Sequence, residues 1–277
     1  GYEKRFEQYD INMDRPPPLV PRHRRLTVIE RMAADGSVLT ELDEGALEAM
    51  IPTLKAEGVE AIAIGFLHSY VNAAHEQRAR DVLAAHMPDV AITISGDVSP
   101  EIREYDRFST ACANAYVQPL MAGYLGRLSA AVKGQGFRGA LLLMMSGGGL
   151  TTLETAQRLP IRLVESGPAG GAILASHIAR ENGLDEVLSF DMGGTTAKIC
   201  LIADGEPERA RVFEVARAYR NLKGSGWPVR IPVIEMVEIG AGGGSIARVD
   251  AMQRITVVPD SAGSEPGPAC YGRSGTN

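Results

Sequence analysis

The chain has 277 residues, of which 45% are hydrophobic and 22% are charged, enough for one large domain or for two. Its formal net charge of −6 argues against a general nucleic-acid binder, and no apolar run reaches the roughly 18 residues of a membrane span. The three cysteines are far apart, which fits neither a disulfide framework nor a zinc site. We therefore expect buried thiols in a cytoplasmic protein without nucleic-acid or membrane contact.

The first hundred residues predict a small α/β arrangement. In chain order, we expect a hairpin, a helix, a strand, a second helix and a second strand over residues 27–40, 44–57, 59–67, 73–86 and 90–95. Pro52 lies inside the first helical pattern, which weakens that assignment. A strand, a helix and a strand in this order predict a βαβ unit whose two strands are parallel.

Further helices are expected in the middle of the chain, including a short one over residues 151–158. Residues 105–133 predict one long helix, or two that meet at Pro119. Large side chains recur along it at helical spacing and favour a core face: Tyr116, Leu120, Tyr124, Leu128 and Val132. Residues 170–182 predict a helix that ends at Gly183 and buries Ile173, Leu174, His177 and Ile178.

The rest of the pattern is mostly β. Strands are expected over residues 140–145, 187–190, 199–202, 231–239, 245–249 and 255–258. Because helices and strands alternate through much of the chain, the predicted fold class is α/β, with a mixed sheet and flanking helices. A domain boundary is expected near residues 100–110.

Residues 189–202 carry the clearest functional signal. An apolar run ends at Asp191, two glycines and two threonines follow at 193–196, and a second apolar run leads away. Glycines let backbone N–H groups approach an anion, hydroxyls donate to phosphate oxygens, and a carboxylate at a strand end can hold a hydrated divalent cation. These are the parts of a nucleoside triphosphate site. The same letters also fit an ordinary β-hairpin turn.

Three glycine clusters bear on that choice, at residues 146–149, 165–171 and 240–245. The first and third follow probable strands, and the second opens a helix, where unpaired N–H groups favour anions. None matches the Gly-x-x-x-x-Gly-Lys-Ser/Thr loop or the dinucleotide-binding fingerprint. Together with the Asp191 segment they favour a nucleotide site, but glycines that merely let segments pack closely remain the alternative. His68 and His75 flank a helix start and give no metal signature of their own.

Longer motifs give a resemblance to a known family. They are Asp-Met-Gly-Gly-Thr-Thr-Ala-Lys (191–198), Val-Glu-Ser-Gly-Pro-Ala-Gly-Gly (164–171), Gly-Ala-Gly-Gly-Gly-Ser-Ile (240–246), Asp-Ser-Ala-Gly-Ser-Glu-Pro-Gly-Pro-Ala-Cys-Tyr-Gly-Arg (260–273) and Glu-Ile-Arg-Glu-Tyr-Asp-Arg (101–107). The chain resembles the hydantoinase A / 5-oxoprolinase family from about residue 60 onward. The resemblance implies an actin-like ATPase fold with a ribonuclease H-like core. It implies an N-terminal hydantoinase/oxoprolinase region over residues 1–105 and an ATPase-type domain over 106–277.

The resemblance also implies an activity: ATP-dependent ring opening of a cyclic amide such as hydantoin, N-methylhydantoin or 5-oxoproline. An ATP-dependent ketone carboxylase subunit and a nucleotide-switched assembly subunit are the alternatives. The implied partners are the small-molecule substrate and a hydantoinase B-type subunit, and a homo-oligomer is compatible with them. The family's first phosphate hairpin does not occur in these 277 residues, so we expect a fragment of a longer protein that is inactive and binds ATP weakly by itself.

The implied site uses ATP and Mg²⁺. Asp191 would be the catalytic residue and the Mg²⁺ ligand. The phosphates would lie at Gly193, Gly194, Thr195 and Thr196 in the family's second phosphate hairpin, and the adenosine at Gly242, Gly243 and Gly244.

Overall fold

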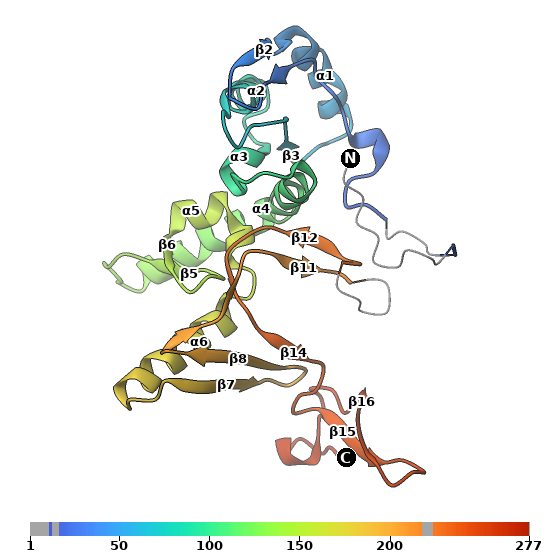
Figure 1. Ribbon diagram of the computed structural model, residues 1–277, viewed down its shortest axis with the longest axis vertical. Helices are drawn as coiled ribbons and strands as arrows, with labels where there is room; N and C mark the ends of the chain where they lie inside the picture. The colour runs from blue at the N-terminus through green and yellow to red at the C-terminus, as the bar shows by residue number, and fades with distance from the viewer. Residues whose placement is uncertain (1–10, 13–16, 218–223, 277) are drawn as a thin grey trace. The chain divides into compact units, whose positions relative to one another are not determined.

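The computed structural model describes residues 11–12, 17–217 and 224–276 (Figure 1). The chain divides into two compact units. The first comprises Gly1–Met145, Gly149–Val164 and Arg211–Pro232, and the second comprises Ser146–Gly148, Glu165–Ala210 and Val233–Asn277. Residues 105 and 106, between which we predict the boundary of the two family regions, both belong to the first unit. The division into compact units therefore does not test that boundary, which stays a prediction. Residues 1–10 of the predicted N-terminal region lie outside the described residues.

The first unit begins with the predicted hairpin and βαβ unit. Its elements in this part are η1 (Arg22–Arg24), β1 (Arg31–Met32), β2 (Val38–Thr40), α1 (Glu44–Ala56), β3 (Ala61–Ile64), α2 (Ala74–His86) and β4 (Ala91–Ile94). Strands β1 and β2 pair antiparallel, whereas β3 and β4 pair parallel, as predicted. The Asp43 carboxylate caps α1 by accepting from the amide of Ala46 at 2.9 Å, and the helix continues through Pro52. Apolar side chains of α1, α2, β3 and β4 form one core.

The remaining elements of the first unit surround one long helix, α4 (Glu104–Gly134), which contains Pro119 without ending there. They are α3 (Ser95–Val98), β5 (Leu142–Met144), β6 (Leu150–Thr152), α5 (Leu153–Arg158), η2 (Pro160–Leu163), β11 (Phe213–Val215) and β12 (Trp227–Val229).

The predicted buried face of this long helix is wrong at its first three positions, whereas Leu128 and Val132 are half-buried. Tyr116 and Leu120 are each 74% exposed and Tyr124 is 50% exposed. The buried positions of α4 carry mainly small or polar side chains: Asp106, Arg107, Thr110, Ala111, Asn114, Ala115, Leu125 and Ser129. Small side chains let neighbouring backbones approach closely, and hydrogen bonds satisfy the buried polar atoms, so size and polar pairing outweighed the apolar periodicity.

Among the described residues, the second unit contains one α-helix and three small antiparallel sheets. Its elements are α6 (Ser166–Glu181), β7 (Glu186–Met192), β8 (Ala197–Ala203), β9 (Glu206–Pro207), β10 (Arg209–Ala210), β13 (Val233–Ile234), β14 (Val237–Ile239), β15 (Ser245–Val249), β16 (Ile255–Ser261) and η3 (Ala269–Tyr271). The main sheet has the order β14-β8-β7, with β9 paired to β8. Side chains of α6 and β8, including Ala169, Ala172, Cys200 and Ile202, form a core with Ile234.

Helix α6, like α4, buries small side chains and exposes some of the large ones that were predicted to be buried. It begins at Ser166, four residues before the prediction, and ends before Gly183, whose φ of +64° fits the predicted stop. Leu174 and Ile178 are at least half exposed, contrary to prediction, and His177 is exposed as well. The buried face is made of Ala169, Ala172, Ser176 and Ala179.

Parallel and antiparallel strands with helices packed against them confirm the predicted α/β class with mixed pairing. Among the described residues, no helix combines the length and the apolar character that a membrane span requires.

Candidate functional site

The Asp191 segment forms the predicted strand, turn and strand. Strands β7 and β8 pair antiparallel over their whole length, with Asp191 opposite Lys198 and Met192 opposite Ala197. The amide of Gly193 donates to the carbonyl oxygen of Thr196 at 2.9 Å and closes the turn. Asp191 lies at the exposed end of β7, with Met192 between it and this turn.

The third glycine cluster lies across this turn. The amides of Gly243 and Gly244 donate to the carbonyl oxygens of Gly193 and Gly194 at 2.9 and 3.0 Å. A Cβ on Gly242 would lie 2.6 Å from the carbonyl carbon of Gly194 and 2.5 Å from the amide nitrogen of Thr195. Glycine is therefore required at Gly242 because the backbones touch there. The two glycine segments form one structure, which we call the glycine crossing (residues 193–196 and 242–244).

The crossing uses several of the backbone donors that a phosphate would need. The amides of Gly193, Gly243 and Gly244 donate to carbonyl oxygens, and the amide of Gly242 donates to the Ser245 hydroxyl at 2.9 Å. Asp191, just before the crossing, and Thr195, within it, are exposed, and Thr196 is half-buried. Carboxylate and hydroxyl oxygens suit a partly hydrated Mg²⁺, and threonine hydroxyls suit phosphate oxygens, so these side chains fit Mg-ATP. Gly243 is exposed and Gly242 and Gly244 are buried, so an adenosine would meet Gly243 first.

The second glycine cluster is linked to strand β8 by an ion pair. Glu165, the residue before α6, has a left-handed φ of +61°, and its carboxylate forms an ion pair with Lys198 on β8. Lys198 also lies 3.6 Å from Glu238, its partner on β14. Burial by itself lowers the pKa of Lys198, but the hydrogen bond and charge of Glu165, together with Glu238, outweigh it and raise that pKa above its usual range. The sequence indicated neither partner, because Glu165 is 33 residues away and the Glu238 pairing depends on strand register.

The first glycine cluster forms a closely packed turn. Residues 147–149 turn the chain between β5 and β6, and the Met145 amide donates to the Gly149 carbonyl oxygen at 2.7 Å. Gly148 has a φ of +83°, and a Cβ there would lie 2.7 Å from Ile173. Close packing of chain segments, the alternative explanation for the glycine clusters, therefore accounts for residues 147–149.

In the first unit, the family motif at residues 101–107 is part of a buried polar network. Glu76, which is fully buried, accepts from the amides of Phe66 and Gly96 and from the Ser95 hydroxyl, at 2.8, 2.8 and 2.6 Å. The same hydroxyl accepts from Nε of Arg107 at 3.1 Å, and Arg107 also donates to the carbonyl oxygens of Glu101 and Phe66. Burial lowers the pKa of Arg107. Because these polar atoms are paired with protein atoms, the network holds β3, α3 and α4 together and leaves no obvious place for a ligand.

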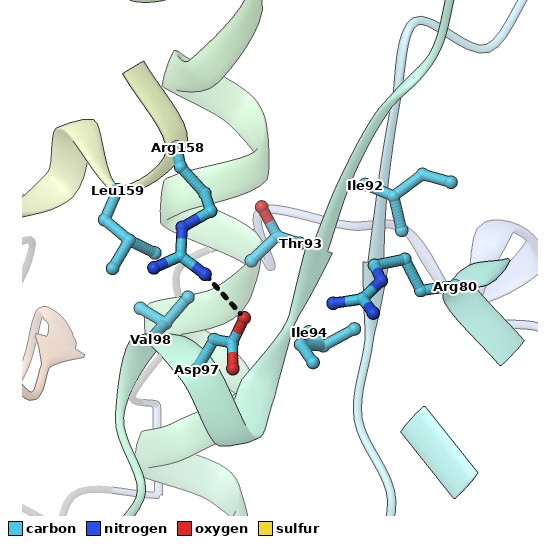
Figure 2. Close-up of a pocket in the computed structure, with 8 residues that line it drawn as sticks. All are labelled: Arg80, Ile92, Thr93, Ile94, Asp97, Val98, Arg158 and Leu159. Atoms are coloured by element: carbon cyan, nitrogen blue, oxygen red, sulfur yellow. Dashed lines mark hydrogen bonds and ion pairs between the residues drawn. The ribbon is translucent and has the colours of Figure 1, made fainter. Parts of the chain in front are cut away.

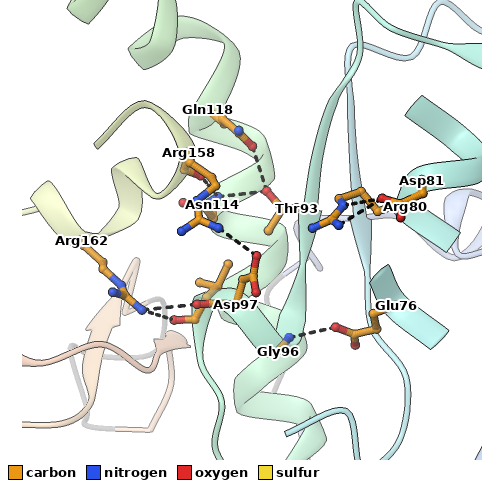
Figure 3. A network of polar contacts seen from close by, with 11 residues as sticks. Glu76, Arg80, Asp81, Thr93, Gly96, Asp97, Asn114, Gln118, Arg158 and Arg162 are labelled. Atoms are coloured by element: carbon orange, nitrogen blue, oxygen red, sulfur yellow. Dashed lines mark hydrogen bonds and ion pairs between the residues drawn. The ribbon is translucent and has the colours of Figure 1, made fainter. Parts of the chain in front are cut away.

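A second part of this network continues toward α5 (Figure 3). The Asn114 amide donates to Thr93 at 2.9 Å, Thr93 donates to Gln118 at 2.9 Å, and Arg158 donates to Asp97 at 3.1 Å.

A cavity of about 40 Å³ lies beside these residues and is drawn with its lining in Figure 2. Ligand pockets are typically about 300–1,000 Å³, so this cavity is too small for a nucleotide or a cyclic amide.

Histidines and cysteines add no chemistry in the part of the chain that the structure describes. Nδ1 of His75 lies 2.9 Å from the buried Glu30 carboxylate, and no group of three or more ligating side chains could hold a metal ion there. Burial raises the pKa of Cys112 and of Cys200, which keeps both thiols protonated and unreactive.

Comparison with known proteins decides the family. The family model for hydantoinase/oxoprolinase matches residues 107–277, and the model for the hydantoinase/oxoprolinase N-terminal region matches residues 1–87. The chain belongs to the hydantoinase/oxoprolinase family. The predicted family resemblance is confirmed.

Three relatives show the range of activities among its members. The chain is 36% identical to the caprolactamase subunit alpha of Pseudomonas jessenii over 99% of its length, and it spans 38% of that protein. It is 32% identical to the acetophenone carboxylase gamma subunit of Aromatoleum aromaticum, covering 95% of this chain and 35% of that protein. It is 32% identical to the 5-oxoprolinase of Saccharomyces cerevisiae, covering 86% of this chain and 18% of that protein. The chain thus spans less than half the length of these relatives.

Two solved structures have the same fold. The ATP-dependent caprolactamase from Pseudomonas jessenii aligns with a TM-score of 0.77 and 35% identity, over 99% of this chain and 38% of that one. The nucleotide-free structure of an acetone carboxylase aligns with a TM-score of 0.72 and 30% identity, over 90% of this chain and 34% of that one. The predicted actin-like ATPase core is consistent with these relationships.

Proposed function

We propose that the hydantoinase/oxoprolinase protein that carries these residues uses ATP to open the ring of a cyclic amide. The observation that carries the proposal is the glycine crossing, which lies beside the exposed Asp191 carboxylate in a member of this family. Relatives named caprolactamase and 5-oxoprolinase act on cyclic amides, and the caprolactamase structure is described as ATP-dependent. The net reaction converts the cyclic amide, ATP and two molecules of water into the ring-opened amino acid, ADP and phosphate, because opening the amide and converting ATP to ADP and phosphate each consume one water.

Asp191 and the residues of the crossing each have a role in this proposal. Asp191 holds the hydrated Mg²⁺, and the hydroxyls of Thr195 and Thr196 donate to phosphate oxygens, with Gly193 and Gly194 leaving room for the phosphates beside them. Gly243 gives the adenosine a flat backbone surface, and Gly242 and Gly244 hold that surface against the turn. ATP supplies a phosphoryl group that makes the amide carbonyl a better electrophile for water. The residues of this chain contribute positioning and electrostatic stabilisation.

The test is an Asp191→Asn variant of the full-length protein. Asp191 is exposed, so the variant should keep its melting temperature and lose ATP turnover by at least about a hundredfold. Asp185→Asn, an exposed carboxylate just before the same strand, is the matched control and should turn over ATP normally. Near-normal turnover in Asp191→Asn would reject the assignment of Asp191.

Ketone carboxylation is the second candidate, favoured by the acetophenone and acetone carboxylase relatives. Incubating the full-length protein with ATP and either a cyclic amide panel or a ketone with bicarbonate distinguishes the two. Amide-dependent ADP release supports ring opening, and ketone-dependent ADP release that needs bicarbonate supports carboxylation.

A partner subunit belongs to the proposal as well. Two of the relatives are named as subunits, alpha and gamma, of larger enzymes. We propose that a hydantoinase B-type subunit completes the enzyme in the cytoplasm, where a reducing environment suits the free thiols of Cys112, Cys200 and Cys270. An assay of the full-length protein with and without that subunit separates an enzyme from a nucleotide-switched assembly subunit.

A further inference from the structure

We propose that the hydroxyl of Tyr271 is a further ligand-binding group of the glycine crossing, donating a hydrogen bond to a phosphate oxygen of the bound nucleotide. This inference rests on the proposed function, because it names a residue of the same site. Tyr271 belongs to the motif at residues 260–273, to which the site described so far gives no role.

The Tyr271 hydroxyl lies where the two glycine segments meet. A Cβ on Gly243 would lie 2.9 Å from this oxygen, and a Cβ on Gly194 would lie 3.7 Å from it. Gly243 and Gly194 are exposed, so the hydroxyl stands at the open surface of the crossing and not in its interior. A residue larger than glycine at position 243 would push against this hydroxyl.

The segment around Tyr271 holds the ring in this place. Tyr271 ends the short helix η3, where its amide donates to the Pro268 carbonyl oxygen at 2.9 Å, and Gly272 follows with a φ of +66°. The ring lies against Gly267, which is buried and has a φ of +75°: a Cβ there would lie 2.6 Å from Cδ2 of Tyr271. Glycine is required at Gly267 both for this backbone conformation and for this contact.

The chemistry of the hydroxyl fits a phosphate. A phenol is a neutral donor at physiological pH, and a hydrogen bond to a charged phosphate oxygen is stronger than one between neutral groups. Within the described residues no hydrogen bond to this hydroxyl is present, and Tyr271 is 40% exposed. The nearby amides of Gly193, Gly243 and Gly244 are already used inside the crossing, so the hydroxyl adds a side-chain donor beside them.

The experiment measures nucleotide affinity of the full-length protein by calorimetry, with ATP and with adenosine as probes. Tyr271→Phe removes only the hydroxyl and should weaken ATP binding roughly tenfold while leaving adenosine binding and the melting temperature unchanged. Gly243→Ala, which displaces the hydroxyl, should weaken ATP binding as well. The control, Tyr124→Phe, removes an exposed hydroxyl from α4 and should change neither affinity.

Other outcomes overturn the inference in distinguishable ways. If Tyr271→Phe binds ATP as tightly as the parent protein or more tightly, the hydroxyl is not a phosphate ligand. If ATP and adenosine are weakened equally, the hydroxyl contacts the nucleoside and not the phosphates. If the parent protein itself binds no ATP, the proposed function fails together with this inference.

Discussion

Lys198 on β8 and Glu165 at the start of α6 form an ion pair that joins the β7–β8 hairpin to the glycine-rich helix start. Glu238 lies on the other side of the same ammonium group. The Lys198 side chain is 16% exposed, so its charge is well shielded from water, whereas the two carboxylates are more exposed. Lys198 therefore stabilises the arrangement of this hairpin and the helix start, with its charge shared between two carboxylates.

Removing this lysine should destabilise the second unit. Lys198→Met leaves Glu165 and Glu238 without their shared cation and should lower the free energy of unfolding by about 1–3 kcal/mol at pH 7. Denaturant unfolding measures the difference, with the exposed Lys55→Met as the control. An unchanged free energy of unfolding in Lys198→Met would show that the pair contributes nothing.

The same pair predicts a dependence on high pH. The folded pKa of Lys198 lies above its unfolded value of about 10.5, so its stabilising contribution is fully present below that pH. As the pH rises through the folded pKa, the ammonium loses its proton and the contribution disappears. The difference in stability between the parent and Lys198→Met should therefore stay constant up to about pH 10 and shrink above it. A difference that already shrinks between pH 7 and pH 9 would contradict this.

Gly242 should tolerate no side chain. A Cβ there would lie within 2.6 Å of backbone atoms of Gly194 and Thr195, which cannot move without opening the crossing. Gly242→Ala should lower the free energy of unfolding by about 1–3 kcal/mol and weaken ATP binding by the full-length protein. Gly240→Ala is the matched control, because a Cβ at Gly240 meets nothing within 4 Å. Equal stability and affinity of the two variants would show that the crossing does not form.

The buried carboxylate of Glu76 gives a prediction for the first unit. Glu76→Gln keeps the shape of the side chain. In the parent, each oxygen of the Glu76 carboxylate accepts from a backbone amide, so in the variant the NH₂ group faces one of these amides and cannot accept its hydrogen bond. The loss of an acceptor in a buried site should cost about 3 kcal/mol in the free energy of unfolding. Glu104→Gln, on the exposed side of the first turn of α4, should cost less than about 0.5 kcal/mol. Comparable urea midpoints for the two variants would refute the prediction.

Glu214 should make the stability of the protein depend on pH in the acidic range, as Lys198 does in the alkaline range. Burial by itself raises the pKa of this carboxyl, but hydrogen bonds from the amides of Gly224 and Gly226 and the charge of Arg217 lower it below its usual value. Its contribution is therefore present above the unfolded pKa of about 4.5 and is lost as the pH falls through the folded pKa. Glu214→Gln should be less stable than the parent at pH 7, and the difference should vanish in acid. The exposed Glu48→Gln should show no such difference at either pH.

Several elements could be predicted because they depend on neighbours in the chain. The turn at residues 193–196 formed where two apolar runs flank glycines and threonines, and the parallel β3–β4 pair followed from a strand, a helix and a strand in sequence. Which side of a helix is buried was harder to predict from the sequence. In α4 and α6 the chain buries small side chains such as Ala111 and Ala172 and leaves Tyr116 exposed, because close backbone approach and polar pairing were more favourable than burying the larger rings.

The sequence by itself determined the family, the α/β class and the local hairpin that carries Asp191, since each depends on contiguous motifs or on short-range periodicity. Only the tertiary structure decided which glycine cluster meets that hairpin. Residues 242–244 cross it through backbone hydrogen bonds, whereas residues 147–149 only turn a chain. The physical reason is that such contacts join backbones about fifty residues apart, and backbone groups are the same in every residue. A sequence can show at which glycines another backbone segment could come close. Only the fold determines which segment of the chain does so.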